Sequence, residues 1–298
     1  MKFLKILLTL NFLFLGFLKL QGQNKKVEIK TEKLTDNIYM ITGQGGNIGV
    51  FIGEEKLFMI DDQFDHLSEQ LKECISKLSN KPLSILFNTH MHGDHTGGNA
   101  NFNSDKVTLV AHDNVRKRVK TNNLEKLREK KIDTNYFTRM LPEITFSNDI
   151  TFYDGDETIM AFHVHNAHTD GDAIVYFMNN NVLHMGDTYF SKRYPFIDLK
   201  SGGSVDGYID AHKKVLLLIN DETKIIPGHG KSSDKKELQE YVLMLEDLKA
   251  NTLKAIAEGK SLEEVQNSKT ISSKYDATHG NGFINPEKLR TTFYTSLK

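Results

Sequence analysis

Within six positions of the segment "NTHMHGDHTGGNA", residues 88–100, stand four side chains of types that bind metals: His90, His92, Asp94 and His95. Two residues that are two positions apart on an extended segment point to the same side, so His90 and His92 can reach one point in space. The glycine that follows lets the backbone turn, which can bring Asp94 and His95 to a second point nearby. The segment therefore predicts two adjacent groups of metal ligands, each incomplete without residues from elsewhere in the chain.

Three further candidate ligands each come directly after a short apolar run. His168 follows "FHVHNA", Asp187 follows "NVLHMG", and His229 follows "TKIIPG". Each stands beside a glycine or another turn residue, at the kind of position where a loop carries functional groups on a rigid scaffold. We expect these three side chains to complete the two groups.

The rest of the chain predicts the scaffold. Short apolar runs separated by glycine or acidic turns indicate strands, beginning with "KVEIKTEKL", "NIYMITG", "NIGVFIG" and "KLFMIDD". A helix is predicted over about 66–78, a charged helical region over roughly 112–140 that we interpret as a solvated face, and a last helix from Pro286. The order strands, helix, strand, helices occurs twice. This order predicts an α+β fold, a four-layer αββα sandwich, formed by one domain over residues 24–298.

Composition limits the classes of partner. The chain has 298 residues, of which 39% are hydrophobic and 26% charged, which is typical of a globular protein. Its formal net charge of -1 provides no excess of positive charge for nucleic acid or for an anionic membrane surface. We therefore expect a small-molecule substrate and no nucleic-acid partner.

The N-terminus has the pattern of a secretory signal. Lys2 and Lys5 precede an apolar run over 6–18, and Gly22 lies near a plausible cleavage point. The run is short for a membrane span, so we predict a signal peptide over residues 1–23, a periplasmic or secreted location, and no stable membrane anchor after cleavage. Cys74 is the single cysteine, which excludes an internal disulfide and fits an inert packed thiol.

The ordered set "THMHGDHTGG", "AHTDGD", "GDTYF" and "IPGHG" resembles the metallo-beta-lactamase superfamily, whose fold is the αββα sandwich. The resemblance implies two zinc ions per chain, although nitrogen and oxygen ligands also suit iron or manganese. The implied ligands of the first metal are His90, His92 and His168; those of the second metal are Asp94, His95 and His229. Asp187 would bridge the two metals together with a hydroxide.

The resemblance also implies a reaction. A zinc-bound hydroxide, available at neutral pH because the metals lower the pKa of a shared water, would attack the carbonyl of an ester, thioester, lactone or β-lactam. Asp94 would be the catalytic residue that orients the hydroxide and passes its proton toward the leaving group. Arg193 and Tyr194 lie in a segment that flanks the metal cleft in this superfamily, so we predict that they contact the substrate. The "GQGGN" turn at 43–47 matches the lactamase substrate-covering hairpin in position.

The substrate class remains open between several alternatives. Asp187 stands where the best-known lactamases carry a cysteine and matches glyoxalase II and lactonases, whereas "AHTDGD" is closer to the lactamases. A true β-lactamase is therefore one alternative. A persulfide dioxygenase is another, with one iron held by His90, His168 and Asp187. A metal-stabilised binding protein without catalysis is disfavoured because every expected ligand is present.

The remaining histidines are predicted to have supporting roles. His163, His165 and His184 alternate along strands next to the candidate ligands and are expected in the core or behind the ligands. The others are expected to be surface or packing residues: His66, His112, His212 and His279.

Overall fold

The computed structural model describes residues 27–298. The predicted signal peptide, residues 1–23, lies outside the described residues, so it stays a prediction. Within residues 27–298, no helix combines the length and the apolar character that crossing a bilayer requires.

The first sheet has seven strands that lie in sequence order. The bounds are β1 (Lys30–Lys33), β2 (Ile38–Thr42), β3 (Ile48–Ile52), β4 (Leu57–Ile60), β5 (Leu83–Asn88), β6 (Thr108–His112) and β7 (Ile144–Phe146). The pairs from β1 to β4 are antiparallel, and those from β4 to β7 are parallel. Because β4, β5 and β6 run in the same direction, their carboxyl ends meet at one edge of the sheet.

The second sheet has six strands in the order β13-β12-β11-β10-β9-β8. The bounds are β8 (Asp149–Asp154), β9 (Glu157–His163), β10 (Ala173–Phe177), β11 (Val182–His184), β12 (Lys224–Ile226) and β13 (Ser233–Asp234). Its only parallel pair among the described residues is β11 with β12. The chain therefore leaves both of these strands at the same edge of the sheet.

The helices follow the predicted order. In the first half they are α1 (Ser68–Leu78), α2 (Gly93–Thr96), α3 (Asn99–Phe102), α4 (Asp113–Arg128) and α5 (Thr134–Arg139). In the second half they are α6 (Val205–Leu218), α7 (Lys235–Ala257), α8 (Leu262–Asn267), α9 (Ser273–His279) and α10 (Pro286–Leu297). Short 3-10 helices complete the chain at η1 (Asp65–Leu67), η2 (Gly186–Thr188), η3 (Leu199–Ser201) and η4 (Lys269–Ile271).

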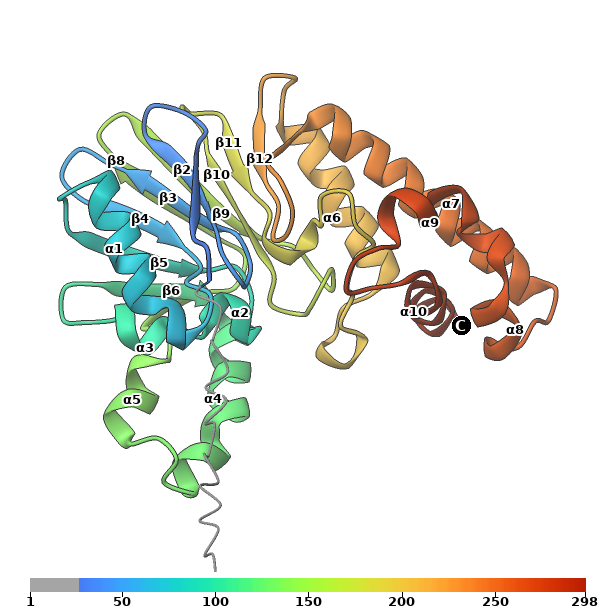
Figure 1. Ribbon diagram of the computed structural model, residues 1–298, viewed down its shortest axis with the longest axis horizontal. Helices are drawn as coiled ribbons and strands as arrows, with labels where there is room; N and C mark the ends of the chain where they lie inside the picture. The colour runs from blue at the N-terminus through green and yellow to red at the C-terminus, as the bar shows by residue number, and fades with distance from the viewer. Residues whose placement is uncertain (1–26) are drawn as a thin grey trace, which may run out of the picture.

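Three apolar cores hold these layers together, and they confirm the αββα sandwich (Figure 1). Between the sheets, rings from both sides meet, as where Phe58 of β4 lies edge-on to Phe177 of β10 with ring centroids 6.0 Å apart. On the outer face of the first sheet, Leu71 and Ile75 of α1 are buried against it. On the outer face of the second sheet, α6, α7 and α10 share the largest core.

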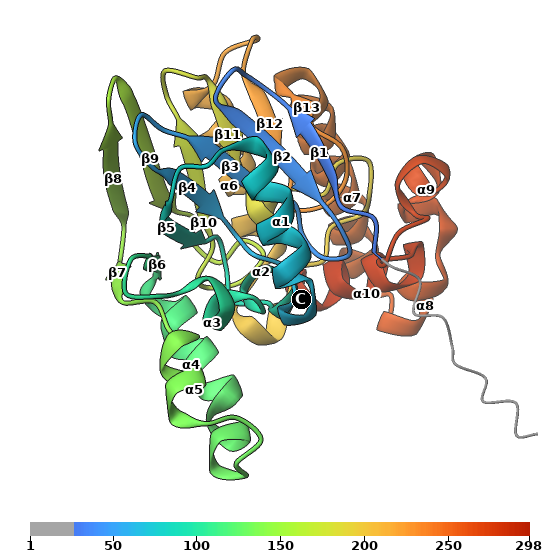
Figure 2. The same ribbon diagram turned by 60° about the vertical axis from the view of Figure 1, so that its left-hand side comes forward.

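The region 112–140 differs from the predicted solvated face. It forms two helices, α4 and α5, that project from the body of the molecule (Figures 1 and 2). One side of the pair is exposed as predicted, but Val115, Val119 and Phe137 are buried in a core of their own. That core includes Met91, which lies between His90 and His92, so the helices pack against the histidine segment.

Candidate metal centre

All seven predicted ligands lie at one end of the sandwich. The histidine segment follows β5, His168 follows β9, Asp187 lies on η2 directly after β11, and His229 follows β12. Because β5 runs parallel to its neighbours and β11 runs parallel to β12, these segments leave the two sheets at edges that face each other. The side chains form two groups with ligand atoms close together, one of His90, His92, His168 and Asp187, the other of Asp94, His95 and His229.

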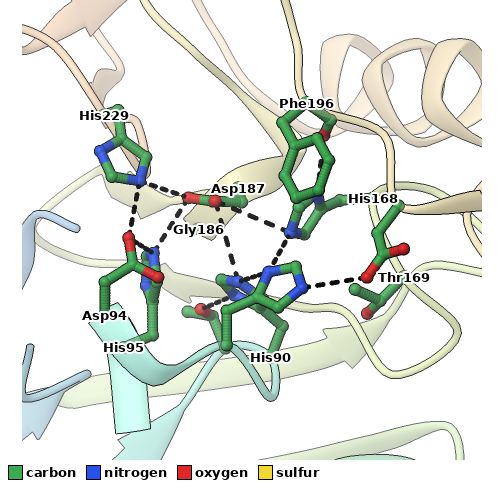
Figure 3. Close-up of polar contacts among 12 residues, drawn as sticks. His90, Asp94, His95, His168, Thr169, Gly186, Asp187, Phe196 and His229 are labelled. Carbon is green, nitrogen blue, oxygen red and sulfur yellow. Dashed lines mark hydrogen bonds and ion pairs between the residues drawn. The ribbon is translucent and has the colours of Figure 1, made fainter. Parts of the chain in front are cut away.

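In the first group, three ring nitrogens converge. Nδ1 of His92 lies 3.1 Å from Nε2 of His90 and 2.9 Å from Nε2 of His168. Oδ2 of Asp187 lies 3.8 Å from the first of these Nε2 atoms and 3.6 Å from the second (Figure 3). Four ligand atoms that all lie within 4.8 Å of one another suit a single cation.

In the second group, Asp94 and the two histidines face each other. Oδ2 of Asp94 lies 3.2 Å from Nε2 of His229 and 3.7 Å from Nε2 of His95. Oδ1 of Asp187 lies 3.1 Å from Nε2 of His95 and 3.4 Å from Nε2 of His229 (Figure 3). The two oxygens of Asp187 thus face different groups, which places this carboxylate between them.

Two glycines let the backbone approach the candidate ligands closely. A Cβ on Gly228 would lie 2.1 Å from Oδ1 of Asp187, and a Cβ on Gly46 would lie 2.1 Å from the ring of His95. Gly46 belongs to the 43–47 turn between β2 and β3, and its N–H donates to the carbonyl of Asp94. The turn therefore packs against the ligand segment, and among its residues none lines the pocket described below.

Each of four ligand rings has its second nitrogen bonded to an oxygen. Nδ1 of His168 donates to the carbonyl of Phe196 at 2.7 Å, and Nε2 of His92 donates to Oδ2 of Asp198 at 3.1 Å. The remaining two bonds join His90 Nδ1 to Thr89 Oγ1 at 3.0 Å and His95 Nδ1 to Asp61 Oδ2 at 2.7 Å. Such bonds fix the ring orientation and the tautomer, and they leave the opposite nitrogen free to bind a metal.

Asp61 connects the two groups, and the sequence analysis missed it. Its carboxylate is fully buried and also accepts bonds from the N–H and the hydroxyl of Thr89, at 2.8 and 2.7 Å. Its φ of 60° places it in the left-handed region, directly after β4. The signal was present in "LFMIDD", where an acidic residue ends an apolar strand at the carboxyl edge of the sheet. Asp198 had no comparable signal, because it lies in an irregular segment before η3.

At Asp187, His90 and His168, the charge and burial of the centre favour the ligand states that a metal requires. Burial would raise the pKa of Asp187, but the charges of His95 and His229 outweigh burial and hold that pKa well below its ordinary value. Burial also lowers the pKa of His168 to about 4, and that of His90 well below its ordinary value. Metals bind ionised carboxylates and neutral imidazoles. At the second group, burial would lower the pKa of His229 and of His95, but the charge of Asp187 outweighs burial and raises the pKa of His229 to about 9 and that of His95 well above its ordinary value. A metal bound there would therefore displace a proton from these rings.

A second, independent observation also indicates that a cation fits this centre. Nε2 of His95 and Oδ1 of Asp187 are buried and lie 3.1 Å apart, but neither atom makes a contact with hydrogen-bond geometry within the described part of the chain. Buried polar atoms are nearly always paired, and each exception needs an explanation. A lone pair on the imidazole and a carboxylate oxygen are both metal donors, so a bound cation would satisfy both atoms.

A pocket of about 410 Å³ opens directly onto the centre. Its floor is formed by ligands from both groups, and its walls are mostly aromatic and aliphatic; the lining residues are Phe64, His92, Gly93, Asp94, Asp187, Phe190, Arg193, Tyr194, Phe196, His229, Phe283 and Ile284. Both predicted substrate contacts, Arg193 and Tyr194, are among them. The hydroxyl of Tyr194 points into the protein, where it donates to Asp276 at 2.8 Å.

The other histidines occupy supporting positions. His184 is buried behind the centre, with Nε2 3.1 Å from the carbonyl of Asn47, and His163 has Nδ1 2.7 Å from the carbonyl of Asp172. Burial lowers the pKa of both rings to about 4. His112 is buried and stacks on His163, with centroids 3.9 Å apart. These three rings pack and support, whereas His165, which was expected in the core or behind the ligands, is exposed; none of the four belongs to the two ligand groups.

Comparison with known proteins agrees with this architecture. The family model of the metallo-beta-lactamase superfamily matches residues 41–229, which is more than half of the chain and includes all seven candidate ligands.

Solved structures show the same fold. A metallo-beta-lactamase from Pontibacter korlensis is 16% identical, with a TM-score of 0.61 over 74% of this chain and 100% of its own. The DIM-1 metallo-beta-lactamase is 23% identical, with a TM-score of 0.59 over 74% of this chain and 99% of its own. The sec-alkylsulfatase Pisa1 from Pseudomonas sp. is 14% identical, with a TM-score of 0.72; the match covers 90% of this chain but 50% of the sulfatase.

Sequence pattern, fold and the arrangement of the site therefore agree: this chain belongs to the metallo-beta-lactamase superfamily, with its hydrolase-type fold and with two groups of histidine and aspartate side chains that could hold metal ions.

Proposed function

We propose that the chain is an exported, binuclear, zinc-dependent hydrolase that acts on a small carbonyl substrate: an ester, thioester, lactone or β-lactam. The observation that carries the proposal is the position of Asp187, whose two oxygens face two separate groups of ligands. Zinc, when bound, lowers the pKa of a coordinated water to about 7 and polarises a substrate carbonyl. The apolar pocket beside the ligands is a suitable place for such a substrate.

The side chains of this protein would bind the metals and transfer the proton. His90, His92 and His168 would hold one metal, and Asp94, His95 and His229 the other, with Asp187 shared. Asp94 also lines the pocket and is partly exposed to it. Burial would raise its pKa, but the hydrogen bond to His229 and the charge of His95 outweigh burial and lower it. Asp94 is thus an ionised carboxylate at the pocket floor, placed to accept a proton and to return it to a leaving group.

Metal analysis of the purified chain beside a hydrolysis panel tests the proposal. We expect two zinc ions per chain and turnover of one class among lactams, lactones and thioesters. One iron per chain, with oxygen uptake on glutathione persulfide, would replace the proposal with the dioxygenase alternative. Turnover of a chromogenic cephalosporin would identify the narrower case of a β-lactamase.

Hydrolysis of sulfate esters is a second candidate reaction. Its support is the match to the sec-alkylsulfatase, which extends over 90% of this chain and so includes a large part of the C-terminal helices. An apolar pocket with one arginine would also accommodate an alkyl chain and a sulfate. Sulfate release from decyl sulfate, measured in the same panel, separates this reaction from carbonyl hydrolysis.

A further inference from the structure

We propose that the substrate carries an apolar acyl or aryl group together with a separate anionic group, and that the C-terminal segment at 282–284 and Arg193 select for these two features. The proposal rests on the proposed function for the reacting bond. It adds the chemical class of the rest of the molecule, which the ligand residues alone leave open.

The apolar surface begins at the metal ligands themselves. Phe190 stacks on His229 with ring centroids 5.2 Å apart and nearly parallel planes, at 7°. Phe196 stacks on His92 with centroids 5.7 Å apart and also meets His168 edge-on at 5.5 Å, as the labelled rings in Figure 3 show for the latter pair. A ring therefore covers one ligand from each group, so a substrate bound there meets aromatic carbon immediately beside the reacting centre.

Phe283 continues this surface to the mouth of the pocket. Its ring meets Phe196 edge-on with centroids 5.7 Å apart, and the ammonium of Lys288 lies 4.8 Å from the ring centroid. Even so, 72% of the residue is exposed, which makes it the only strongly exposed large apolar residue within 27–298 that lines this pocket. An exposed aromatic ring at the edge of a concave apolar site gains free energy when a ligand covers it.

The wall that carries Phe283 comes from a part of the chain outside the family match. The segment lies between α9 and α10, far beyond residue 229. Ile284 is 6% exposed and joins the core of the second half, so it fixes the segment to the body of the protein. This side of the pocket is therefore supplied by the segment between two C-terminal helices, outside the residues that the family model matches.

Arg193 supplies the charged part of the recognition. Its side chain is exposed at the pocket, and among residues 27–298 no carboxylate forms an ion pair with its guanidinium. A Cβ on Gly282 would lie 3.5 Å from Cδ of Arg193, so the aliphatic stem rests on the same C-terminal segment. A guanidinium binds carboxylate or phosphate in a bidentate manner, and an unpaired one at the mouth of an apolar site matches an anionic group on the ligand.

The neighbouring Lys192 offers a matched control. It stands next to Arg193 in sequence, but its ammonium is 2.8 Å from the carboxylate of Glu237 and it does not line the pocket. Tyr153 offers the control for an exposed ring, because it is 78% exposed on β8 and is not part of the pocket lining.

Binding of two matched probes to the purified, metal-loaded chain tests the proposal by calorimetry: 4-phenylbutyrate and its neutral counterpart 4-phenylbutanol. We expect Arg193→Gln to weaken binding of the acid by about tenfold and to leave the alcohol unchanged, which is the loss of one charge-assisted contact. Phe283→Ala should weaken both probes by about fivefold or more. Lys192→Gln and Tyr153→Ala should bind both probes like the wild type.

Equal binding of the acid by wild type and Arg193→Gln would overturn the anionic part, because the metal alone would then hold the carboxylate. Equal binding of both probes by Phe283→Ala, with an unchanged melting temperature, would overturn the apolar part. The probes are not hydrolysed, so this test is separate from the hydrolysis panel. If the probes bind as expected but the hydrolysis panel shows no turnover of any carbonyl substrate, the proposed function is rejected. The proposed class of ligand, an apolar group with an anionic group, would then still hold.

Discussion

At the residue scale, the centre depends on which atoms stand behind the ligands as much as on the ligands themselves. Asp61 holds His95 from behind, and Asp198 holds His92. Asp198 contacts a ligand of the first group, whereas Asp61 contacts His95 of the second group directly and reaches His90 of the first only through Thr89. Because each carboxylate directly contacts a ligand of a different group, mutation of one or the other should affect the two sites unequally.

Asp94→Asn should remove most of the turnover while the fold survives. The amide keeps the size of the side chain but loses the ability to take up and return a proton, a contribution of roughly 10²–10⁴-fold to the rate. Steady-state kcat/KM checks the loss of turnover, and a thermal melt of the same sample checks that the fold survives. Wild-type rates in the variant would reject the catalytic role of Asp94.

Asp61→Asn should weaken chiefly the second metal site, and Asp198→Asn chiefly the first. We expect a loss of roughly 10–100-fold in affinity at the second site for Asp61→Asn and at the first site for Asp198→Asn, since a ligand without its orienting partner is less basic and less well placed. Competition with a colorimetric chelator measures the two affinities in each variant. Each variant is the control for the other, and equal losses at both sites in both variants would contradict these assignments.

At the scale of elements, the direction of the strands decides where the candidate ligands lie, and helix α6 supports one of them from behind. The parallel pairs β4–β5–β6 and β11–β12 direct their carboxyl ends to the site, which explains why apolar runs in the sequence are followed by ligands. Helix α6 lies behind η2 and is fixed there by the hydroxyl of Tyr208, which donates to the carbonyl of Asp187 at 3.2 Å. The helix also brings His212 into the core, between Tyr208 and Tyr241.

His212 makes the stability of this element depend on pH. The ring is completely buried, and burial lowers its pKa from 6.5 to about 4. Above pH 6.5 the ring is neutral in both the folded and the unfolded chain. As the pH falls from 6.5 to 4, only the unfolded chain takes up the proton, so folding stability falls by up to about 3 kcal/mol from this residue.

Urea unfolding of His212→Asn at pH 7 and pH 4 measures this contribution. Between pH 7 and pH 4, the free energy of unfolding should fall less in the variant than in the wild type, by about 3 kcal/mol, whatever the difference between the two proteins at pH 7. Other buried histidines contribute to both proteins and cancel in the comparison. Parallel pH profiles for the two proteins would show that His212 is protonated freely in the folded state.

At the scale of the whole molecule, metal and fold stabilise each other. The candidate ligands come from four separate segments of the chain, which are brought together only in the folded state. A metal that binds the folded and not the unfolded chain stabilises it by about 2.7 kcal/mol when its concentration is 100 times the dissociation constant.

Removal of metal with a chelator should therefore lower the melting temperature, by roughly 5–10 °C for one or two sites in a chain of this size. Differential scanning calorimetry with and without the chelator checks the value, and addition of excess zinc should restore it. A melting temperature that does not respond to the chelator would contradict metal binding at this centre.

The sequence by itself determined the set of candidate ligands, its division into two groups and the layer order, because each depends on local patterns: histidines two apart on an extended segment, apolar runs that end at a candidate ligand, and the order of strands and helices. Only the tertiary structure decided three other features: the contact of Asp198 with His92, the burial of one side of α4, and the position of Phe283 at the pocket. Each of these acts across a long separation in the chain, 106 positions between His92 and Asp198, and no local period or spacing marks such a pair in advance. Packing of the C-terminal helices against the second sheet is what brings Phe283 and Arg193 to the mouth of the same pocket.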